Sequence, residues 1–193
     1  MKLAVIKYNA GNIQSVFYAL NRLGVEPLLT DDIEIIRSAD RVIFPGVGEA
    51  SAAMNYLKQK GLDKLIPKLK QPVLGVCLGQ QLMCEYSEEN DTQCLGIFAQ
   101  KVRKFEPHLK VPHIGWNNIF ELKSPLFDGL PSAPFVYFVH SYYVESGDFT
   151  TATADYILPF SAAMHKDNFY AVQFHPEKSG DDGAKILENF LKI

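Results

Sequence analysis

The fold is decided by residues 73–82, which read VLGVCLGQQL. The stretch opens with a short apolar run, typical of a strand buried on both faces, and passes directly into a helix predicted from Leu78 to about Tyr86. Gly75 and Gly79 let the backbone turn sharply and let neighbouring elements approach closely. The pattern G-x-C-x-G is therefore the thiol form of a nucleophile elbow, the strand-to-helix turn that presents a reactive side chain above a sheet.

Strands and helices alternate around this elbow. Apolar runs predict strands at 2–8, 25–29, 41–44 and 169–174, and helical spacing predicts helices at 13–23, 49–60 and 180–193. This alternation indicates an α/β fold with a central, mostly parallel sheet flanked by helices. From Cys94 to about Tyr156 the segments are short, aromatic and broken by Pro and Gly, which predicts additional antiparallel strands, clearest from Phe135 to Val144. Since no linker or repeat interrupts the pattern, residues 1–193 are expected to form a single domain.

The composition is that of an ordinary globular chain. With 47% hydrophobic and 21% charged residues it does not match a disordered segment. No apolar run approaches the roughly 20 residues of a membrane span, and the first residues read as a strand rather than a signal peptide. A net charge of −3 argues against a nucleic-acid partner. Three cysteines without a signal peptide indicate reduced thiols and a cytoplasmic location.

Cys77 is the candidate nucleophile. At the start of a helix, the dipole and the free N–H groups favour a thiolate. The N–H of Leu78 can donate to a tetrahedral oxyanion. The plain alternative is a small buried cysteine in a tight turn. Cys84 and Cys94 are expected in the core, and neither the cysteine spacing nor the five histidines predict a metal site.

His175-Pro176-Glu177 offers a base and an orienting acid. In an extended segment residues two apart point the same way, so His175 and Glu177 can meet. A surface turn is the alternative. His140 competes as the base but has no acid two residues away, and Ser141 has no glycine elbow around it. The other histidines are expected to be exposed or structural: His108, His113 and His165.

Pro45-Gly46-Val47-Gly48 lies between a predicted strand and a predicted helix. Its backbone N–H groups can form an anion-binding nest, the second half of an oxyanion hole and part of a substrate pocket. A simple strand-to-helix turn is the alternative.

The three motifs occur in a specific order. P-G-x-G near residue 46, G-V-C-L-G-x-Q-L at 75–82 and F-H-P-E-K at 174–178 together resemble the class I (triad-type) glutamine amidotransferases. Within that class the chain is similar to the glutaminase subunits of imidazole glycerol phosphate synthases, along segments 8–12, 112–117 and 138–143. The segment PHIGWN at 112–117 discriminates most. One departure is Lys7-Tyr8-Asn9, where the family usually has Asp-Tyr-Gly.

This resemblance implies a Cys77–His175–Glu177 triad that hydrolyses glutamine through a γ-glutamyl thioester, with no cofactor and no metal. It implies a glutamine pocket built from residues of three segments: Gly46, Gly48, Gln81, Ser141 and Tyr142. It also implies a heterodimer with a (β/α)₈-barrel cyclase, which receives the ammonia and makes imidazole glycerol phosphate and AICAR. The residues expected to face that partner or the ammonia exit are Asn12, Trp116, Asn117 and Lys178.

The position of Val47 between two glycines predicts a conformational switch in the backbone. Between two glycines its peptide can rotate with little resistance from its neighbours. If its N–H points away from the site in the free subunit, the oxyanion hole is incomplete, and partner binding would turn the peptide. Losing one oxyanion donor costs roughly 10²–10³ in rate, so activity should rise at least that steeply with the partner and its nucleotide ligand.

Other readings fit parts of the pattern. A glutaminase subunit could feed a different synthase, such as one acting on nucleotide-linked sugars. A cysteine hydrolase of γ-glutamyl peptides would share the triad without a partner, and a non-catalytic binding subunit would need a decayed triad. A flavodoxin-like domain binding phosphate at 45–48 would need no cysteine at the elbow.

Overall fold

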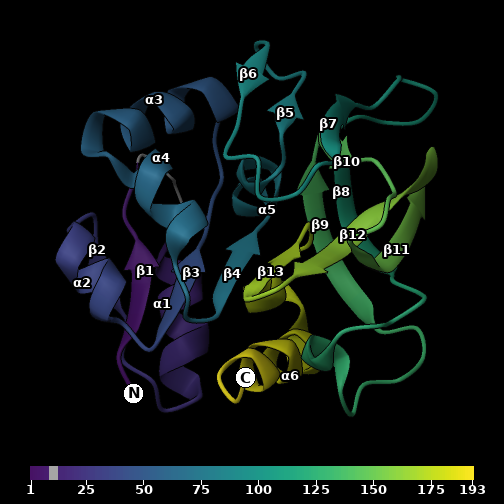
Figure 1. Cartoon of the computed structure of the whole chain (residues 1–193). Coiled ribbons are helices and arrows are strands. Elements are labelled where there is room, and N and C mark those ends of the chain that lie inside the picture. Colours follow the sequence, from purple (N-terminus) through teal and green to yellow (C-terminus); the bar gives the residue numbers. More distant parts are fainter. Residues whose placement is uncertain (9–12) are drawn as a thin grey trace.

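A computed structural model describes residues 1–8 and 13–193. Its centre is a seven-stranded sheet in the order β11-β12-β13-β4-β3-β1-β2 (Figure 1). The five strands from β13 to β2 are parallel, and β12 and β11 extend the sheet in antiparallel pairing. Their bounds are β1 Leu3–Ile6, β2 Leu28–Thr30, β3 Arg41–Phe44, β4 Val73–Val76, β11 Thr150–Tyr156, β12 Leu158–Lys166 and β13 Phe169–Val172. The expected α/β fold with a mostly parallel central sheet is confirmed.

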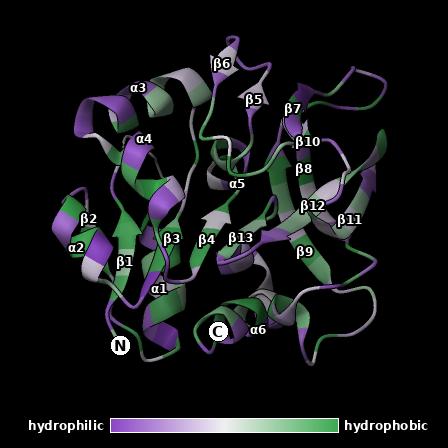
Figure 2. Ribbon diagram, viewed as in Figure 1, coloured by the Kyte–Doolittle hydropathy of each residue, from purple (hydrophilic) through white to green (hydrophobic). Residues whose placement is uncertain are grey.

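Helices cover both faces of the parallel strands. Residues of α3 and α5 pack on one face, and residues of α1 and α6 pack on the other. The helices are α1 Ile13–Arg22, α2 Ile33–Ser38, α3 Ala50–Lys60, α4 Leu62–Leu65, α5 Leu78–Met83 and α6 Gly180–Phe190. The central strands are hydrophobic along their length, as burial on both faces requires (Figure 2). None of the helices in the described ranges is long and apolar enough to cross a membrane.

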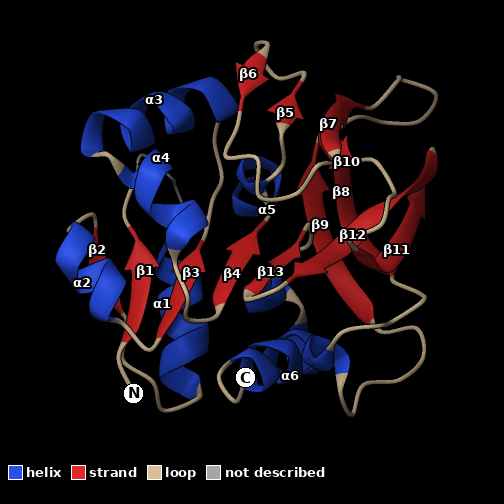
Figure 3. Cartoon of the chain, viewed as in Figure 1, coloured by secondary structure: helices blue, strands red, loops and turns tan. Residues whose placement is uncertain are grey.

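Residues 86–144 add two small sheets (Figure 3). One has the order β10-β7-β5-β6 and the other pairs β8 with β9. Their strands are β5 Tyr86–Ser87, β6 Thr92–Gln93, β7 Lys101–Lys104, β8 His113–Asn118, β9 Phe135–His140 and β10 Tyr142–Val144. The single strand predicted over 135–144 is therefore wrong in one respect. It divides at Ser141, because its halves pair with different strands.

The helix after the elbow is also shorter than expected. It ends at Met83, and Tyr86 lies in β5. The carbonyls of Leu82 and Met83 accept hydrogen bonds from the N–H groups of residues 95, 97 and 98, so the last turn is closed by a distant loop rather than by further helix. Tertiary contacts here override the apolar pattern.

The elbow has the geometry that its glycines allow. Cys77 itself has φ 52° and ψ −107°, a conformation that costs a non-glycine residue roughly 1–3 kcal/mol. A Cβ on Gly79 would lie 1.9 Å from the carbonyl oxygen of Phe44, and a Cβ on Gly75 would lie 2.9 Å from the sulfur of Met83. The close approach of α5 to β3 therefore depends on Gly79, which sets where Cys77 stands.

Replacing Gly79 by alanine is expected to destabilise the fold. The new methyl would overlap a backbone oxygen, which cannot swing away, so the free energy of unfolding should fall by about 2 kcal/mol or more. Gly24→Ala is the comparison, because nothing lies within 4 Å of its Cβ and only the strain of φ +75° remains, about 1 kcal/mol. Unfolding in urea measures the free energy of unfolding of both variants. Equal losses in the two variants would contradict the packing account.

Candidate active site

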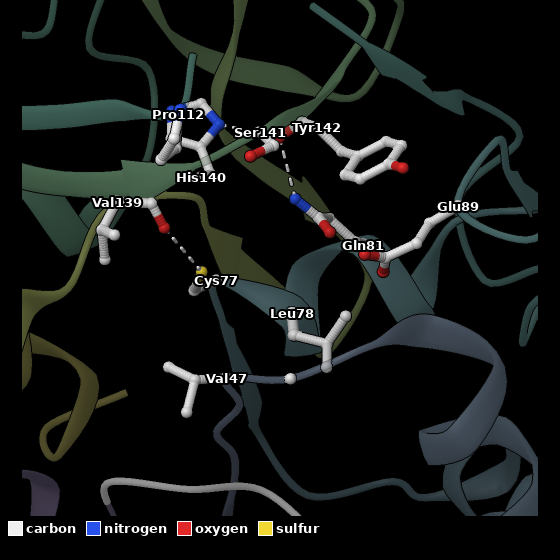
Figure 4. A pocket seen from close by; sticks show the side chains of 11 residues that line it. Val47, Cys77, Leu78, Gln81, Glu89, Pro112, Val139, His140, Ser141 and Tyr142 are labelled. Carbon is white, nitrogen blue, oxygen red and sulfur yellow. Dashed lines mark hydrogen bonds between the residues drawn. The ribbon is translucent and has the colours of Figure 1, made fainter.

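Cys77 lines a cavity of about 280 Å³. Its sulfur accepts a hydrogen bond from Nε2 of Gln173 at 3.6 Å. Its thiol donates toward the carbonyl of Val139 at 3.8 Å (Figure 4). The sulfur therefore stands between the end of β13 and strand β9, facing the space that a substrate would occupy.

His175 and Glu177 form a pair sealed from solvent. Nδ1 of His175 donates to Oε1 of Glu177 at 2.8 Å, and the two side chains are only 2% and 3% exposed. The expected extended segment is wrong in detail, since Pro176–Lys178 is a 3₁₀ turn, but the turn brings the two side chains together. Among the described residues Nε2 of His175 has no hydrogen-bond partner, so this nitrogen remains available.

The pKa of His175 depends on both Glu177 and Cys77. Burial lowers the pKa of His175, but the nearby Cys77 side chain and the hydrogen-bonded Glu177 carboxylate together raise that pKa to about 10. The imidazole beside the sulfur is thus protonated when the sulfur is a thiolate. The structure brings together the three side chains that the sequence selected as nucleophile, base and orienting acid.

The cavity collects most of the predicted pocket residues. It is lined by Val47, Gly48, Cys77, Leu78, Gln81, Glu89, Pro112, Val139, His140, Ser141 and Tyr142. The amide of Gln81 donates to the carbonyl of Tyr142 and to Oε1 of Gln173, both at 3.0 Å. Gln81 is therefore linked to the Cys77 sulfur through Gln173 rather than by a direct hydrogen bond.

Gly46 and Leu78, by contrast, are bonded to each other. The N–H of Leu78 donates to the carbonyl oxygen of Gly46 at 3.3 Å. Because a peptide is planar and trans, the N–H of Val47 points the opposite way from that carbonyl. The N–H of Leu78, one expected oxyanion donor, is thus occupied by the Gly46 carbonyl. The N–H of Val47, the other expected donor, points away from the N–H of Leu78.

Tyr8 packs against the turn formed by Pro45 and Gly46. Its hydroxyl donates to the carbonyl of Pro45, and a Cβ on Gly46 would lie 1.9 Å from the hydroxyl oxygen. Burial, with the charge of Cys77, raises the pKa of Tyr8, so the hydroxyl keeps its proton. Only glycine fits at position 46.

Sequence reasoning missed Glu89 and Gln173. Glu89 is the one carboxylate among the described residues that line the cavity, and its Oε2 accepts from the N–H of Ala50 at 2.8 Å. Glu89 lies in the turn after β5, which carries no motif, and only the fold brings it to Cys77. Gln173 stands two residues before His175, the same spacing as Glu177, and that proximity was the available signal.

The residues expected to face a partner lie mainly on β8 and the turn after His175. Trp116 is 47% exposed and stacks on Phe135 at 5.5 Å. Tyr137 lies between Trp116, at 6.0 Å, and Nζ of Lys178, at 5.9 Å. Asn117 donates to the carbonyl of Asp155. Asn12 lies outside the described residues.

Comparisons with known proteins show the family of this chain. Residues 4–193 match the model of the class-I glutamine amidotransferases. The chain is 62% identical to the imidazole glycerol phosphate synthase subunit HisH of Bacteroides fragilis strain YCH46, covering all of both chains. It is 44% identical to the subunit HisH of Haemophilus influenzae, covering 100% of this chain and 98% of that one. The chain belongs to the HisH family of class I glutamine amidotransferases.

Solved structures support the fold of this HisH-family chain. A crystal structure of a glutamine amidotransferase matches with a TM-score of 0.77 at 19% identity, covering 98% of this chain and 97% of that one. A glutamine amidotransferase from Thermotoga maritima matches with a TM-score of 0.67 at 15% identity, covering 100% and 83%. The family resemblance drawn from the motifs is confirmed, and the reading as a flavodoxin-like phosphate-binding domain is wrong.

Proposed function

We propose that this glutaminase subunit of imidazole glycerol phosphate synthase, a glutamine amidotransferase of histidine biosynthesis, works through Cys77, His175 and Glu177. The observation that carries the mechanism is the sealed His175–Glu177 pair beside the Cys77 sulfur. The thiolate attacks the side-chain carbonyl carbon of glutamine. The Nε2 proton of His175 passes to the departing nitrogen, ammonia leaves, and a γ-glutamyl thioester remains.

The second half of the reaction uses the same groups. His175, now neutral, takes a proton from water, which attacks the thioester carbonyl. The sulfur leaves as thiolate, glutamate is released, and the imidazole is protonated again. Glu177 keeps Nδ1 protonated throughout and so holds Nε2 toward the sulfur. All the groups used are side chains and backbone N–H groups of this chain, and no cofactor takes part.

Glutamine binding is assigned to the rest of the cavity. Free glutamine carries an α-ammonium group, and Glu89 supplies the carboxylate that can pair with it. The α-carboxylate and the aliphatic chain of glutamine are assigned to the rest of the cavity lining. These residues are Gly48, Gln81, Ser141 and Tyr142.

Replacing Glu89 by glutamine is expected to raise KM for glutamine about 10-fold or more, because a charge-assisted hydrogen bond to the ammonium is lost, while kcat changes little. Partial burial raises the pKa of Glu89, and Glu49 adds to that shift. As the pH falls through this raised pKa, the carboxylate is neutralised and the wild-type KM should rise too. Steady-state kinetics from neutral pH downward measure both effects. A KM that stays at the wild-type value would refute the assignment.

The partner is proposed to be a (β/α)₈-barrel cyclase, held as a heterodimer that receives the ammonia. The family membership and the exposed Trp116 support this assignment, because tryptophan side chains are enriched near the centres of protein interfaces. Three free cysteines support a reducing, cytoplasmic setting.

The test is glutamate release from glutamine with and without the cyclase subunit and its nucleotide ligand. We expect release that depends on the cyclase, and copurification of the two chains. Full activity without any partner would favour a hydrolase of γ-glutamyl compounds. Copurification with a different synthase, and stimulation by it, would favour the alternative in which the ammonia goes to a substrate such as a nucleotide-linked sugar.

A further inference from the structure

Two histidines that the mechanism does not use lie at the glutamine pocket, and one of them, His140, lines the cavity. His113 on β8 and His140 on β9 are direct partners across the antiparallel pair, and both are buried. Nδ1 of His113 lies 3.0 Å from Nε2 of His140, and Nδ1 of His140 lies 2.7 Å from the carbonyl oxygen of Tyr142. The prediction for His113 was an exposed or a structural histidine, and the structure places it in the core beside His140.

The direction of these hydrogen bonds follows from the acceptor at one end. A carbonyl oxygen can only accept, so Nδ1 of His140 carries the proton. Burial lowers the pKa of His140 to about 3 and that of His113 to about 4, so both rings are neutral. Nε2 of His140 is therefore the acceptor, and Nδ1 of His113 must donate to it.

The Tyr142 carbonyl extends this series of hydrogen bonds toward Cys77. The Tyr142 carbonyl accepts from His140 and also from the amide of Gln81 (Figure 4). The second amide hydrogen of Gln81 goes to Oε1 of Gln173, whose own amide donates to the Cys77 sulfur. An unbroken series of hydrogen bonds thus runs from His113 to Cys77, buried except at the Tyr142 carbonyl, where it is part-buried.

The outer end of this series is held rigidly by packing. The ring of His113 stacks on Tyr156, with centroids 3.9 Å apart and planes 12° apart, and on Phe138 at 4.9 Å. His113 cannot turn away from His140 without breaking both stacks. Because β8 also carries Trp116 and Asn117, the series begins on the strand assigned to the partner face.

We infer that His113 is a positioning residue for glutamine hydrolysis. It fixes the position of the Cys77 sulfur relative to the glutamine pocket. It acts through the hydrogen bonds of His140, the Tyr142 carbonyl, Gln81 and Gln173. The inference rests on the proposed function. Loss of the His113 donor leaves Nε2 of His140 buried without a partner, and relaxation of that ring frees the Tyr142 carbonyl.

The test compares two replacements of His113 in the complete complex with the cyclase. His113→Leu removes the donor and should lower kcat/KM for glutamine roughly 10- to 100-fold, the size expected when a buried hydrogen-bonding group loses its partner. His113→Asn keeps an N–H close to the position of Nδ1 and should recover most of the loss. His165→Leu is the matched control. His165 also stacks on a tyrosine, Tyr170 at 4.1 Å, and contacts a carbonyl, but it lies outside the cavity.

A double-mutant cycle separates positioning from general damage. Gln173→Leu alone should lower kcat/KM, and the double variant His113→Leu/Gln173→Leu should lose little more than the worse single variant, because one series is already broken. Strictly additive losses, or a His113→Leu enzyme with wild-type kinetics, would overturn the inference. If His113→Leu does not fold, as judged by its melting temperature, His113→Phe takes its place in the cycle, because phenylalanine keeps an aromatic ring for the stacks on Tyr156 and Phe138 and has no N–H to donate to His140. An inactive wild-type complex would instead reject the proposed function.

Discussion

Cys77→Ala is expected to abolish glutamine hydrolysis, with kcat falling by roughly 10⁴-fold or more, as for other enzymes that lose their nucleophile. The reason is that the thioester cannot form, while the His175–Glu177 pair and the cavity remain in place. The measurement is glutamate release by the complex at saturating glutamine. A variant that keeps a few per cent of the activity would contradict the triad.

Cys84 and Cys94 provide the matched controls. Both are buried free cysteines, like Cys77, but neither lines the cavity. Burial raises the pKa of both thiols, that of Cys94 to about 12, which leaves them protonated and unreactive. Alanine at either position is therefore expected to cost some stability and to leave kcat within about twofold, because small core truncations act on packing rather than on chemistry.

Val47→Pro is expected to remove the response to the partner. In the free chain the N–H of Leu78 donates to the carbonyl of Gly46, so the proposed oxyanion hole is closed. Turning the Gly46–Val47 peptide would release Leu78 and present the N–H of Val47. The cyclase and its ligand should then raise wild-type kcat by roughly 10²–10³. Proline has no N–H to present, so the variant should stay near its unstimulated rate.

Val47→Ala is the control for this prediction, since it shortens the side chain and keeps the backbone N–H. It should respond to the cyclase like the wild type. The KM for glutamine and the affinity for the cyclase should be similar in all three proteins, because the N–H of Val47 is needed only for the tetrahedral intermediate. If Val47→Pro is stimulated as strongly as Val47→Ala, the switch does not operate through this peptide.

The sequence predicted those features that are local. The elbow could be found because strand, glycines, cysteine and helix occupy one short segment, and His175 and Glu177 could be found because they are two residues apart. The turn that joins the pair was misjudged, but its consequence was right. The resemblance supplied the order of the motifs and the family.

The features that escaped prediction depend on pairing between distant segments. Hydrophobic alternation over 135–144 cannot show that the chain changes sheets at Ser141. Glu89 reaches the cavity only because the turn after β5 is placed beside α3. The burial of His113 depends on Tyr156 and Phe138, neither of which is near it in the sequence.

The central claim, that Cys77 carries the acyl intermediate, is tested most directly by mass spectrometry of an acid-quenched reaction between glutamine and the complex with the cyclase. We expect a γ-glutamyl adduct on the peptide that contains Cys77, absent in Cys77→Ala and absent from the peptides that contain Cys84 or Cys94. Rapid glutamate release with no adduct on Cys77 in single-turnover samples, or an adduct at another residue, would contradict the account.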